Sequence, residues 1–251
     1  MLKTLDLSLK VLSLFKGDKT VWSVNEIADH LGENNTKIYR IVETFTKNNY
    51  LNKNNHNKTY QLGTSILELG LNVNSMYEIK KIIHPYLLFI TEKTQESSFL
   101  TILDDNEALT LDAVTGPSPI NYAVSIGSKA PLYAGASYRS ILAFLPDYLI
   151  KTILSGDIKK FTTNTKTDTK HILDDLDKIR KKGFAISEGE LTEDIVAVAV
   201  PLYINGTIIG SITVSGPTYR ITEQHIKSYV EILLDVKNNL ENNNELSILF
   251  T

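Results

Sequence analysis

Apolar residues recur at helical spacing in the stretch 34–51. Ile38, Ile41, Val42 and Phe45 fall at i, i+3, i+4 and i+7, so one stripe along a helix is apolar. The opposite face holds hydroxyl, amide and basic side chains and few acids. The pattern predicts a helix that is buried on one side and presents hydrogen-bond donors to solvent on the other. Such donors are what DNA phosphates and base edges accept, although many ordinary surface helices carry them too.

A shorter helix is predicted just before this one. Ser23 and Glu26 match the capping box, in which a serine hydroxyl and a glutamate carboxylate satisfy free N–H groups at a helix start. Gly32 follows the apolar residues of this segment and fits the left-handed end of a helix. A short helix, a glycine turn and a second helix with a polar outer face are typical of a helix-turn-helix.

Residues 50–63 predict a hairpin after the second helix. Two strand-like runs flank a polar tip that contains Lys53, His56 and Lys58 and no acid. A hairpin in this place is a wing, and its basic tip suits a phosphate backbone or a minor groove. A flexible surface loop is the alternative interpretation.

The first predicted helix, residues 5–15, is apolar on two faces and therefore needs two partners. We expect its second stripe to pack against another subunit or the helix after the wing, with burial inside the same chain as the alternative. The first stripe consists of Leu5, Leu9 and Leu12, and the second consists of Leu7, Val11 and Leu14.

The remaining chain alternates between helical and strand-like patterns, which predicts an α+β domain. Asn205-Gly206 lies between two apolar runs and is a strong signal for a hairpin turn. Pro85 is expected to break or restart a helix. The predicted helices cover 66–90, a segment after 138, 172–180 and 222–240, and the predicted strands cover 98–103, 108–115, 120–125, 184–187, 195–203 and 207–215.

These patterns divide the chain into three parts. Residues 1–63 form a winged helix-turn-helix domain, 64–78 a helical linker, and 79–251 a second domain with its own core. A length of 251 residues with 42% apolar residues is enough for a core in each domain.

Charge is distributed unevenly between these parts. Residues 1–62 contain nine lysines and arginines against six acids, a formal charge of +3, whereas the whole chain carries -3 and the remainder therefore about -6. The chain contains no cysteine, which excludes disulfides and thiolate metal sites. No stretch resembles a secretion signal or a membrane span, so we expect a soluble cytoplasmic protein without a membrane partner.

No catalytic, metal or cofactor site is predicted. The five histidines show no paired spacing, and neither a Gly-x-Ser-x-Gly elbow nor a phosphate-binding Gly-x-x-x-x-Gly-Lys loop is present. Ser187, Glu188 and Glu190 permit three interpretations: a catalytic carboxylate pair, groups that orient or exclude an anionic effector, or an acid-rich turn without function. On a strand, Glu188 and Glu190 would share one side and Ser187 would face the other.

Two further segments are candidates for binding a small molecule. Tyr133-Ala-Gly-Ala-Ser-Tyr138 is a loop of small residues that opens a helix, where free N–H groups accept anions. Thr213 and Ser215 share one face of a strand, as hydroxyls that bind a ligand would. Buried hydroxyls need partners, and neighbouring backbone groups could supply them as well as a carboxylate ligand could.

In the order of its predicted elements and motifs, the chain resembles the IclR family of bacterial transcription regulators over nearly its whole length. The resemblance rests on 23–31 with 36–44 and 49–51, on Ile126-Gly-Ser-Lys-Ala-Pro-Leu-Tyr133 with Ser140-Ile-Leu-Ala143, and on Gly183-Phe-Ala-Ile-Ser-Glu-Gly-Glu190 through Val198-Ala-Val-Pro201 to Ser215-Gly-Pro217 and Arg220. The chain departs from the family at Ala134-Gly-Ala-Ser-Tyr-Arg139, where members commonly end a small-residue run in Gly-Lys, and at Ala197, where some members have cysteine.

The resemblance implies a winged helix-turn-helix joined to a GAF-like effector-binding domain, and a repressor or activator whose operator affinity is set by a small-molecule effector. The implied partners are an operator duplex, a small carboxylate and a second copy of the chain, as a homodimer or dimer of dimers. An enzyme that uses the C-terminal pocket and a protein-interaction adaptor are the alternatives. The DNA-binding residues expected are Asn35, Thr36, Lys37, Tyr39, Arg40, Thr44, Lys53 and Lys58, and the effector-binding residues expected are Tyr133, Ala134, Gly135, Ala136, Ser137, Ser187, Glu188, Glu190, Ala197, Thr213 and Ser215.

Overall fold

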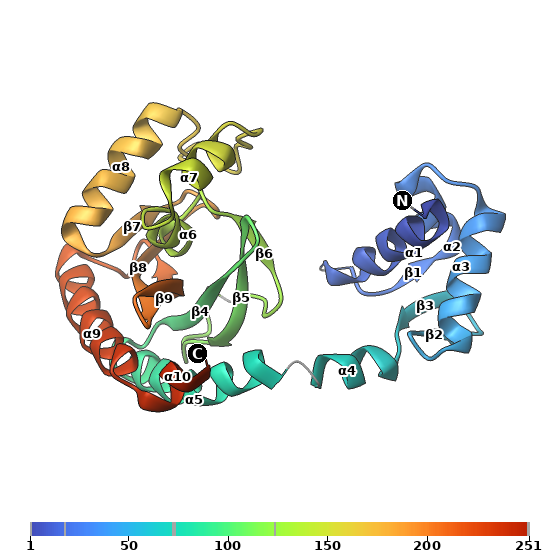
Figure 1. Ribbon diagram of the computed structural model, residues 1–251, viewed down its shortest axis with the longest axis horizontal. Coiled ribbons are helices and arrows are strands. Elements are labelled where there is room, and N and C mark those ends of the chain that lie inside the picture. The colour runs from blue at the N-terminus through green and yellow to red at the C-terminus, as the bar shows by residue number, and fades with distance from the viewer. Residues whose placement is uncertain (1, 18, 72–73, 123, 250–251) are drawn as a thin grey trace. The chain divides into compact units, whose positions relative to one another are not determined.

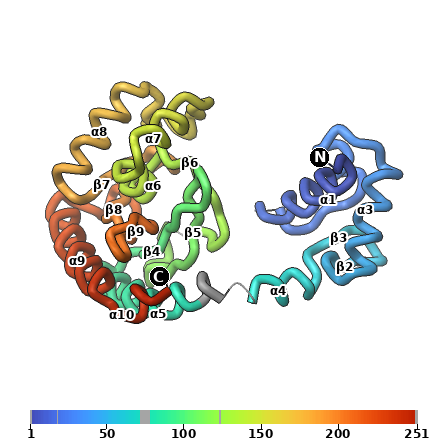
Figure 2. Tube along the Cα trace, viewed as in Figure 1, coloured from blue at the N-terminus to red at the C-terminus, as the bar shows by residue number. Residues whose placement is uncertain are grey.

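The computed structural model describes residues 2–17, 19–71, 74–122 and 124–249 and consists of two compact units, residues 1–77 and 78–251 (Figures 1 and 2). No helix within the described residues combines the length and apolar character needed to cross a bilayer.

The first unit is a winged helix-turn-helix. A three-stranded antiparallel sheet, ordered β1-β3-β2, packs beside three helices. The predicted hairpin is present, with a third strand, β1, added to it. The elements are α1 (Lys3–Ser13), a 3-10 turn (Leu14–Lys16), β1 (Trp22–Ser23), α2 (Val24–Leu31), α3 (Asn35–Lys47), β2 (Leu51–Asn54), β3 (Thr59–Leu62) and α4 (Thr64–Leu71).

The core of this unit corrects the expectation for α1. Leu7 and Val11 are buried inside the unit, at 6% and 0% exposure, and pack against α2, α3 and the sheet. Their side chains are therefore not available for contact with another subunit. Leu14 also packs on this core. The exposed apolar residues of α1 are instead Leu5 and Leu9, from the other stripe. Intrachain burial, the alternative interpretation, is therefore correct for the second stripe.

The second unit is built on one antiparallel sheet of order β6-β5-β4-β9-β8-β7. Helices α6 to α8 cover one face and α5 with α9 the other (Figure 1). The elements are α5 (Asn74–Thr94), β4 (Ser97–Asp104), β5 (Glu107–Val114), β6 (Lys129–Pro131), α6 (Ala136–Leu142), α7 (Asp147–Leu154), α8 (Thr169–Lys182), β7 (Ala185–Glu188), β8 (Ile195–Ile204), β9 (Thr207–Pro217), α9 (Glu223–Glu241) and α10 (Asn244–Leu249).

The alternation of side chains along each strand determines which residues of the sheet face each layer of helices. Phe99, Thr101 and Thr213 face α6, whereas Leu100 and Ile212 point to the opposite side. The hairpin at Asn205-Gly206 is present, and both residues have positive φ, 50° and 75°, as a type I′ turn requires.

Two predictions for this unit are wrong. The expected strand 120–125 does not form in its described residues, and the short strand β6 follows it instead. Helix α5 runs through Pro85 without a break. The proline costs α5 one backbone hydrogen bond but does not end it, because Ile83, Leu87 and Ile90 are fully buried and hold the helix on the sheet.

Candidate functional site

The start of α2 and the turn into α3 have the predicted local structure. Ser23 Oγ accepts the Glu26 N–H at 3.3 Å, and the Glu26 carboxylate accepts the Ser23 N–H at 2.8 Å, which completes the capping box. Hydrogen bonds from Lys19 and Ser23 lower the pKa of Glu26 to about 2. Gly32 ends α2 with a φ of 64°, in the left-handed region. This turn fixes where α3 begins.

Helix α3 is divided between core and solvent as its pattern predicts. Ile38 and Val42 are fully buried, and Ile41 nearly so. Burying each such side chain contributes about 1.5–3 kcal/mol, which holds the helix in one rotational setting. The predicted DNA-binding residues of α3 all lie on the exposed side: Asn35, Thr36, Lys37, Tyr39, Arg40 and Thr44.

The basic residues of this surface differ in their partners. Lys37 Nζ lies 3.0 Å from the Glu33 carboxylate, so part of its charge is already compensated. Arg40 and Lys58 have no ion-pair partner among the described residues, and both side chains are exposed. Among the predicted DNA-binding residues they are the cations most available to a phosphate.

Lys53 is not the free cation that the sequence indicated. Its Nζ donates to Glu43 Oε1 at 2.6 Å, and the Tyr60 hydroxyl donates to the same oxygen at 2.9 Å. The hydrogen bonds from Lys53 and then Tyr60 lower the pKa of Glu43. This cluster ties α3 to the wing, and no local pattern could reveal it because its members lie on three separate elements.

The second unit has a small cavity between the start of α6, the end of β7 and the chain that leads into β8. Its volume is about 30 Å³, room for a single water molecule. Its lining combines aromatic and aliphatic groups with a few polar ones: Phe99, Tyr122, Gly135, Ala136, Ser137, Tyr138, Ser187, Glu190, Leu191, Thr192, Ile195 and Ala197.

Ser137 connects the cavity to the sheet through hydroxyl groups. Its Oγ lies 2.9 Å from Thr101 Oγ1, 2.7 Å from Thr213 Oγ1 and 3.3 Å from Ser211 Oγ. All four side chains are buried. Thr213 is therefore satisfied by α6 and does not line the cavity, which supports the interpretation that protein groups partner its hydroxyl. Ser215 Oγ, by contrast, is buried without a hydrogen-bond partner among the described residues.

The loop before α6 approaches the predicted acidic segment closely. The Ala136 N–H donates to Ser187 Oγ at 2.9 Å, and the Gly135 N–H donates to Glu190 Oε2 at 3.4 Å. Gly135 has a φ of 100°, and a Cβ there would lie 3.3 Å from the Tyr138 ring. Two backbone donors expected to hold a ligand are thus engaged by the chain's own side chains.

Glu190 and Ser187 share a side, contrary to the prediction from strand alternation. Strand β7 ends at Glu188, and Gly189 turns the chain with a φ of 63°, which reverses the direction of Glu190. Glu190 is consequently buried at 5% exposure beside the cavity, while Glu188 is exposed and does not line it.

A buried ion-pair network compensates the charge of Glu190. Arg139, which is completely buried, donates to both Glu190 oxygens, at 2.7 Å for Nη2 and Oε1. Arg139 Nε lies 2.7 Å from Asp175 of α8, and Lys166 Nζ lies 3.0 Å from the same carboxylate. Two cations and two carboxylates balance here, which favours a structural role for Glu190 over general acid-base chemistry.

Other predicted residues have different positions. The Tyr133 hydroxyl accepts the Lys159 N–H at 2.7 Å, away from the cavity, and Ala134 is buried in the core beneath α6. Ala197 does line the cavity. The effector-binding residues expected from the sequence did not include Phe99, Tyr122 or Tyr138, which line the cavity. The departure from the family pattern at Tyr138 was a usable signal, because a large side chain replaces a small one there. Burial and then the neighbouring Tyr122 raise the pKa of Tyr138.

Two sequence profiles match this chain. One describes the IclR helix-turn-helix domain and covers residues 4–55, and the other describes the bacterial transcriptional regulator IclR C-terminal region and covers residues 72–242. The chain belongs to the IclR family of bacterial transcription regulators. This assignment confirms the resemblance drawn from the sequence. It also confirms that the chain is a DNA-binding regulator modulated by a small-molecule effector, and not an enzyme.

Individual IclR proteins align along almost the full chain. The chain is 28% identical over 235 residues to the HTH-type transcriptional regulator KipR of Bacillus subtilis (strain 168), covering 93% of both. Its fold is similar to that of an IclR transcriptional regulator from Alicyclobacillus acidocaldarius, with a TM-score of 0.86 and 24% identity, covering 98% of this chain and 99% of that one. An IclR homolog from Microbacterium hydrocarbonoxydans, complexed with 4-hydroxybenzoate, gives a TM-score of 0.82 at 19% identity, covering 96% and 100%.

No group of three or more histidine, aspartate or glutamate side chains suited to a metal ion occurs in the part of the chain that the structure describes. The predicted site residues thus gather at two places within the described residues, the exposed face of α3 with the wing and the cavity beside α6.

Proposed function

We propose that residues 1–63 bind an operator duplex through α3 and the wing, that residues 64–78 connect the two domains, and that residues 79–251 bind the effector. The observation that supports DNA contact is the exposed face of α3, where Arg40, without an ion-pair partner among the described residues, lies among amide and hydroxyl donors. Asn35, Thr36, Lys37, Tyr39 and Thr44 complete this surface. Bases accept hydrogen bonds from such groups in the major groove.

Selection from a pool of random duplexes tests this proposal. The protein should enrich one sequence, and its affinity for that sequence should fall steeply as salt rises, because phosphate contacts release counterions. Failure to enrich any sequence, or an affinity independent of salt, would reject residues 1–63 as the operator-binding domain.

We also propose that the effector is a small carboxylate with an apolar body, bound in the cavity beside α6. Phe99, Tyr122 and Tyr138 supply aromatic walls, and the hydroxyls of Ser137 and Ser187 are hydrogen-bond donors. The 4-hydroxybenzoate bound by the Microbacterium hydrocarbonoxydans homolog is a molecule of this kind. Since the cavity measures about 30 Å³, a ligand of that size enters only when wall residues move.

Thermal-shift screening tests the ligand class. Benzoate and 4-hydroxybenzoate should raise the melting temperature, whereas the neutral analogues benzamide and benzyl alcohol should not. Stabilisation by the neutral compounds alone would exclude a carboxylate effector. A ligand alters operator binding only by binding the two conformational states of the regulator unequally, so the same compounds should change operator affinity.

We further propose that the regulator acts in the cytoplasm as a homodimer or a dimer of dimers. Leu5 and Leu9 expose an apolar strip on α1, at 54% and 55% exposure, that a second copy could cover. A symmetric dimer matches the two half-sites of a pseudo-palindromic operator. Sedimentation of the free protein and of its operator complex measures the copy number directly.

A further inference from the structure

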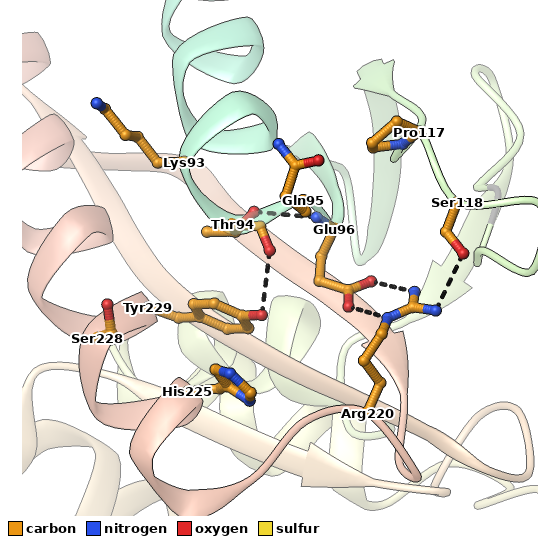
Figure 3. A pocket seen from close by; sticks show the side chains of 10 residues that line it. All are labelled: Lys93, Thr94, Gln95, Glu96, Pro117, Ser118, Arg220, His225, Ser228 and Tyr229. Atoms are coloured by element: carbon orange, nitrogen blue, oxygen red, sulfur yellow. Dashed lines mark hydrogen bonds and ion pairs between the residues drawn. The ribbon is translucent and has the colours of Figure 1, made fainter.

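Arg220, which follows β9, lies beside a surface cleft of about 600 Å³ at the end of α5 (Figure 3). Its guanidinium binds both carboxylate oxygens of Glu96, with Nε 2.5 Å from Oε1 and Nη2 2.7 Å from Oε2. Glu96 is buried at 2% exposure. A bidentate pair with a buried carboxylate fixes the plane and position of the guanidinium.

The remaining donors of Arg220 hold the loop between β5 and β6. Nη1 and Nη2 both lie 3.2 Å from the Ile120 carbonyl oxygen, and Nη1 also donates to Ser118 Oγ at 3.1 Å. Within the loop, Asn121 Nδ2 donates to the carbonyl oxygens of Ser118, at 2.6 Å, and Gly116, at 3.2 Å. The loop is attached at its start by the Gly116 N–H, which donates to Ser97 Oγ of β4 at 3.0 Å, and farther along at Ser118 and Ile120 by the side chain of Arg220.

The same loop carries part of the cavity wall. Tyr122, two residues after Ile120, lines the cavity, and its hydroxyl lies 3.5 Å from Thr192 Oγ1 on the opposite rim. The position of Tyr122 therefore depends on where Ile120 is held. Arg220 itself does not line the cavity.

We infer that Arg220 is a positioning residue for effector binding: by anchoring the loop 116–122 it keeps Tyr122 over the cavity. The effect of Arg220 on effector binding rests on the proposed effector site. The anchoring of the loop by Arg220 can be measured without DNA or effector. Arginine suits this place because its planar fork binds both Glu96 oxygens and the Ile120 carbonyl oxygen in fixed directions. The single nitrogen of a lysine has three N–H donors but cannot reproduce this bidentate geometry.

Single-cysteine reporters test this inference, since the natural chain has no cysteine to label. Ala197→Cys places a thiol in the cavity wall, and Ala199→Cys places one on the same strand in the fully buried core. The alkylation rate by iodoacetamide is measured for both thiols in the otherwise natural chain and with Arg220→Lys. Labelling of a transiently opened site follows the population of its open form.

With Arg220→Lys we expect labelling at position 197 to become roughly tenfold faster, the effect of losing one or two hydrogen bonds that close the loop. Labelling at position 199 should not change. Asn121→Ala loosens the loop but leaves Glu96 paired with Arg220, and it should also make labelling at position 197 faster. This variant replaces Arg220→Lys in the experiment if the lysine variant does not fold. Arg180→Lys is the matched control, because Arg180 binds the Ala143 carbonyl elsewhere in this unit.

Equal labelling at position 197 in all variants would overturn the inference. So would parallel acceleration at positions 197 and 199, which would show general destabilisation instead of loop opening. Failure of the effector proposal has a different signature, namely no thermal shift with benzoate in the natural chain while the labelling difference persists.

Discussion

Glu43 on α3 and Lys53 on the wing form an ion pair with 2.6 Å between Oε1 and Nζ, and they join the two elements expected to meet DNA. The pair makes the junction between α3 and the wing nearly neutral. Because Tyr60 donates to the same carboxylate, breaking the pair leaves Glu43 with one partner.

This pairing predicts unequal salt effects for the two wing lysines. Lys58→Ala should reduce the slope of log affinity against log salt by about 0.9, the value for one lost phosphate contact. Lys53→Ala should reduce it by less, and Glu43→Gln should make it steeper by releasing Lys53. Operator titrations between low and moderate salt measure all three slopes. Equal reductions for both lysine variants would show that Lys53 exchanges Glu43 for phosphate on binding.

Arg40 should contribute more to operator affinity than Lys37. Arg40→Ala is expected to cost about 1–3 kcal/mol of binding free energy, because its guanidinium has no competing partner in the described chain. Lys37→Ala should cost less, since Glu33 already pairs with that ammonium. Equilibrium binding to the selected duplex measures both. An unchanged affinity in a folded Arg40→Ala protein would remove Arg40 from the interface.

The capping box should make the first unit sensitive to acid. The pKa of Glu26 is about 2 in the folded chain against an ordinary value of 4.5. The contribution of its carboxylate to the stability of the folded state is therefore fully present above pH 4.5 and is lost as the pH falls toward 2. Trp22, the one tryptophan of the chain, lies next to this cap and reports on it by fluorescence. Glu26→Gln should abolish the acid-dependent loss. Persistence of the same loss in that variant would assign it to other carboxylates.

Breaking the buried pair of Arg139 and Glu190 should destabilise the second unit strongly. Arg139→Met leaves Glu190 buried with Lys166 as its remaining cation, and removal of one partner from such a pair costs about 3–5 kcal/mol. The double variant Arg139→Met/Glu190→Leu should be more stable than Arg139→Met alone. Thermal unfolding followed by circular dichroism compares the natural chain, the Arg139→Met and Glu190→Leu single variants and the double variant, and strictly additive losses would contradict the coupling.

The exposed strip of α1 should support self-association. Replacing Leu5 and Leu9 together with glutamate should shift the protein toward monomer in sedimentation at micromolar concentration, because charges would enter an apolar contact. The Leu7→Glu change, made in the core of the unit, should instead prevent folding. A natural chain that sediments as a monomer would refute the dimer.

Short-range signals in the sequence were sufficient for the helix-turn-helix and for the hairpin between β8 and β9. Ser23 with Glu26 and Gly32 in the first unit, and Asn205-Gly206 in the second, act within a few residues, so their structures follow from local chemistry. The expected strand 120–125 does not form in its described residues because a long-range contact, which no local signal reveals, replaces strand pairing. The Ile120 carbonyl bonds to Arg220, a hundred residues away, instead of to a neighbouring strand.

The candidate cavity was predictable only in part. The small-residue loop and Ser187 were found from their composition, but the direction of Glu190 depends on the positive φ of Gly189, which strand alternation does not anticipate. Phe99 and Tyr122 come from distant elements, so only the folded sheet and its loop bring them together. The neutralisation of Lys53 by Glu43 is likewise a tertiary contact.

The hydroxyl of Ser137 has three hydroxyl neighbours and only one hydrogen to give. Ser211 gives its own hydrogen to the Ser137 carbonyl oxygen at 2.8 Å, so Ser137 Oγ donates to one of its three hydroxyl neighbours and accepts hydrogens only from Thr101 and Thr213. A polar group that reached Ser137 from the cavity would take one of these places and force the remaining hydrogens to be reassigned. Binding in the cavity would then change the direction of hydrogen bonds on β4 and β9, where Thr101, Ser211 and Thr213 lie.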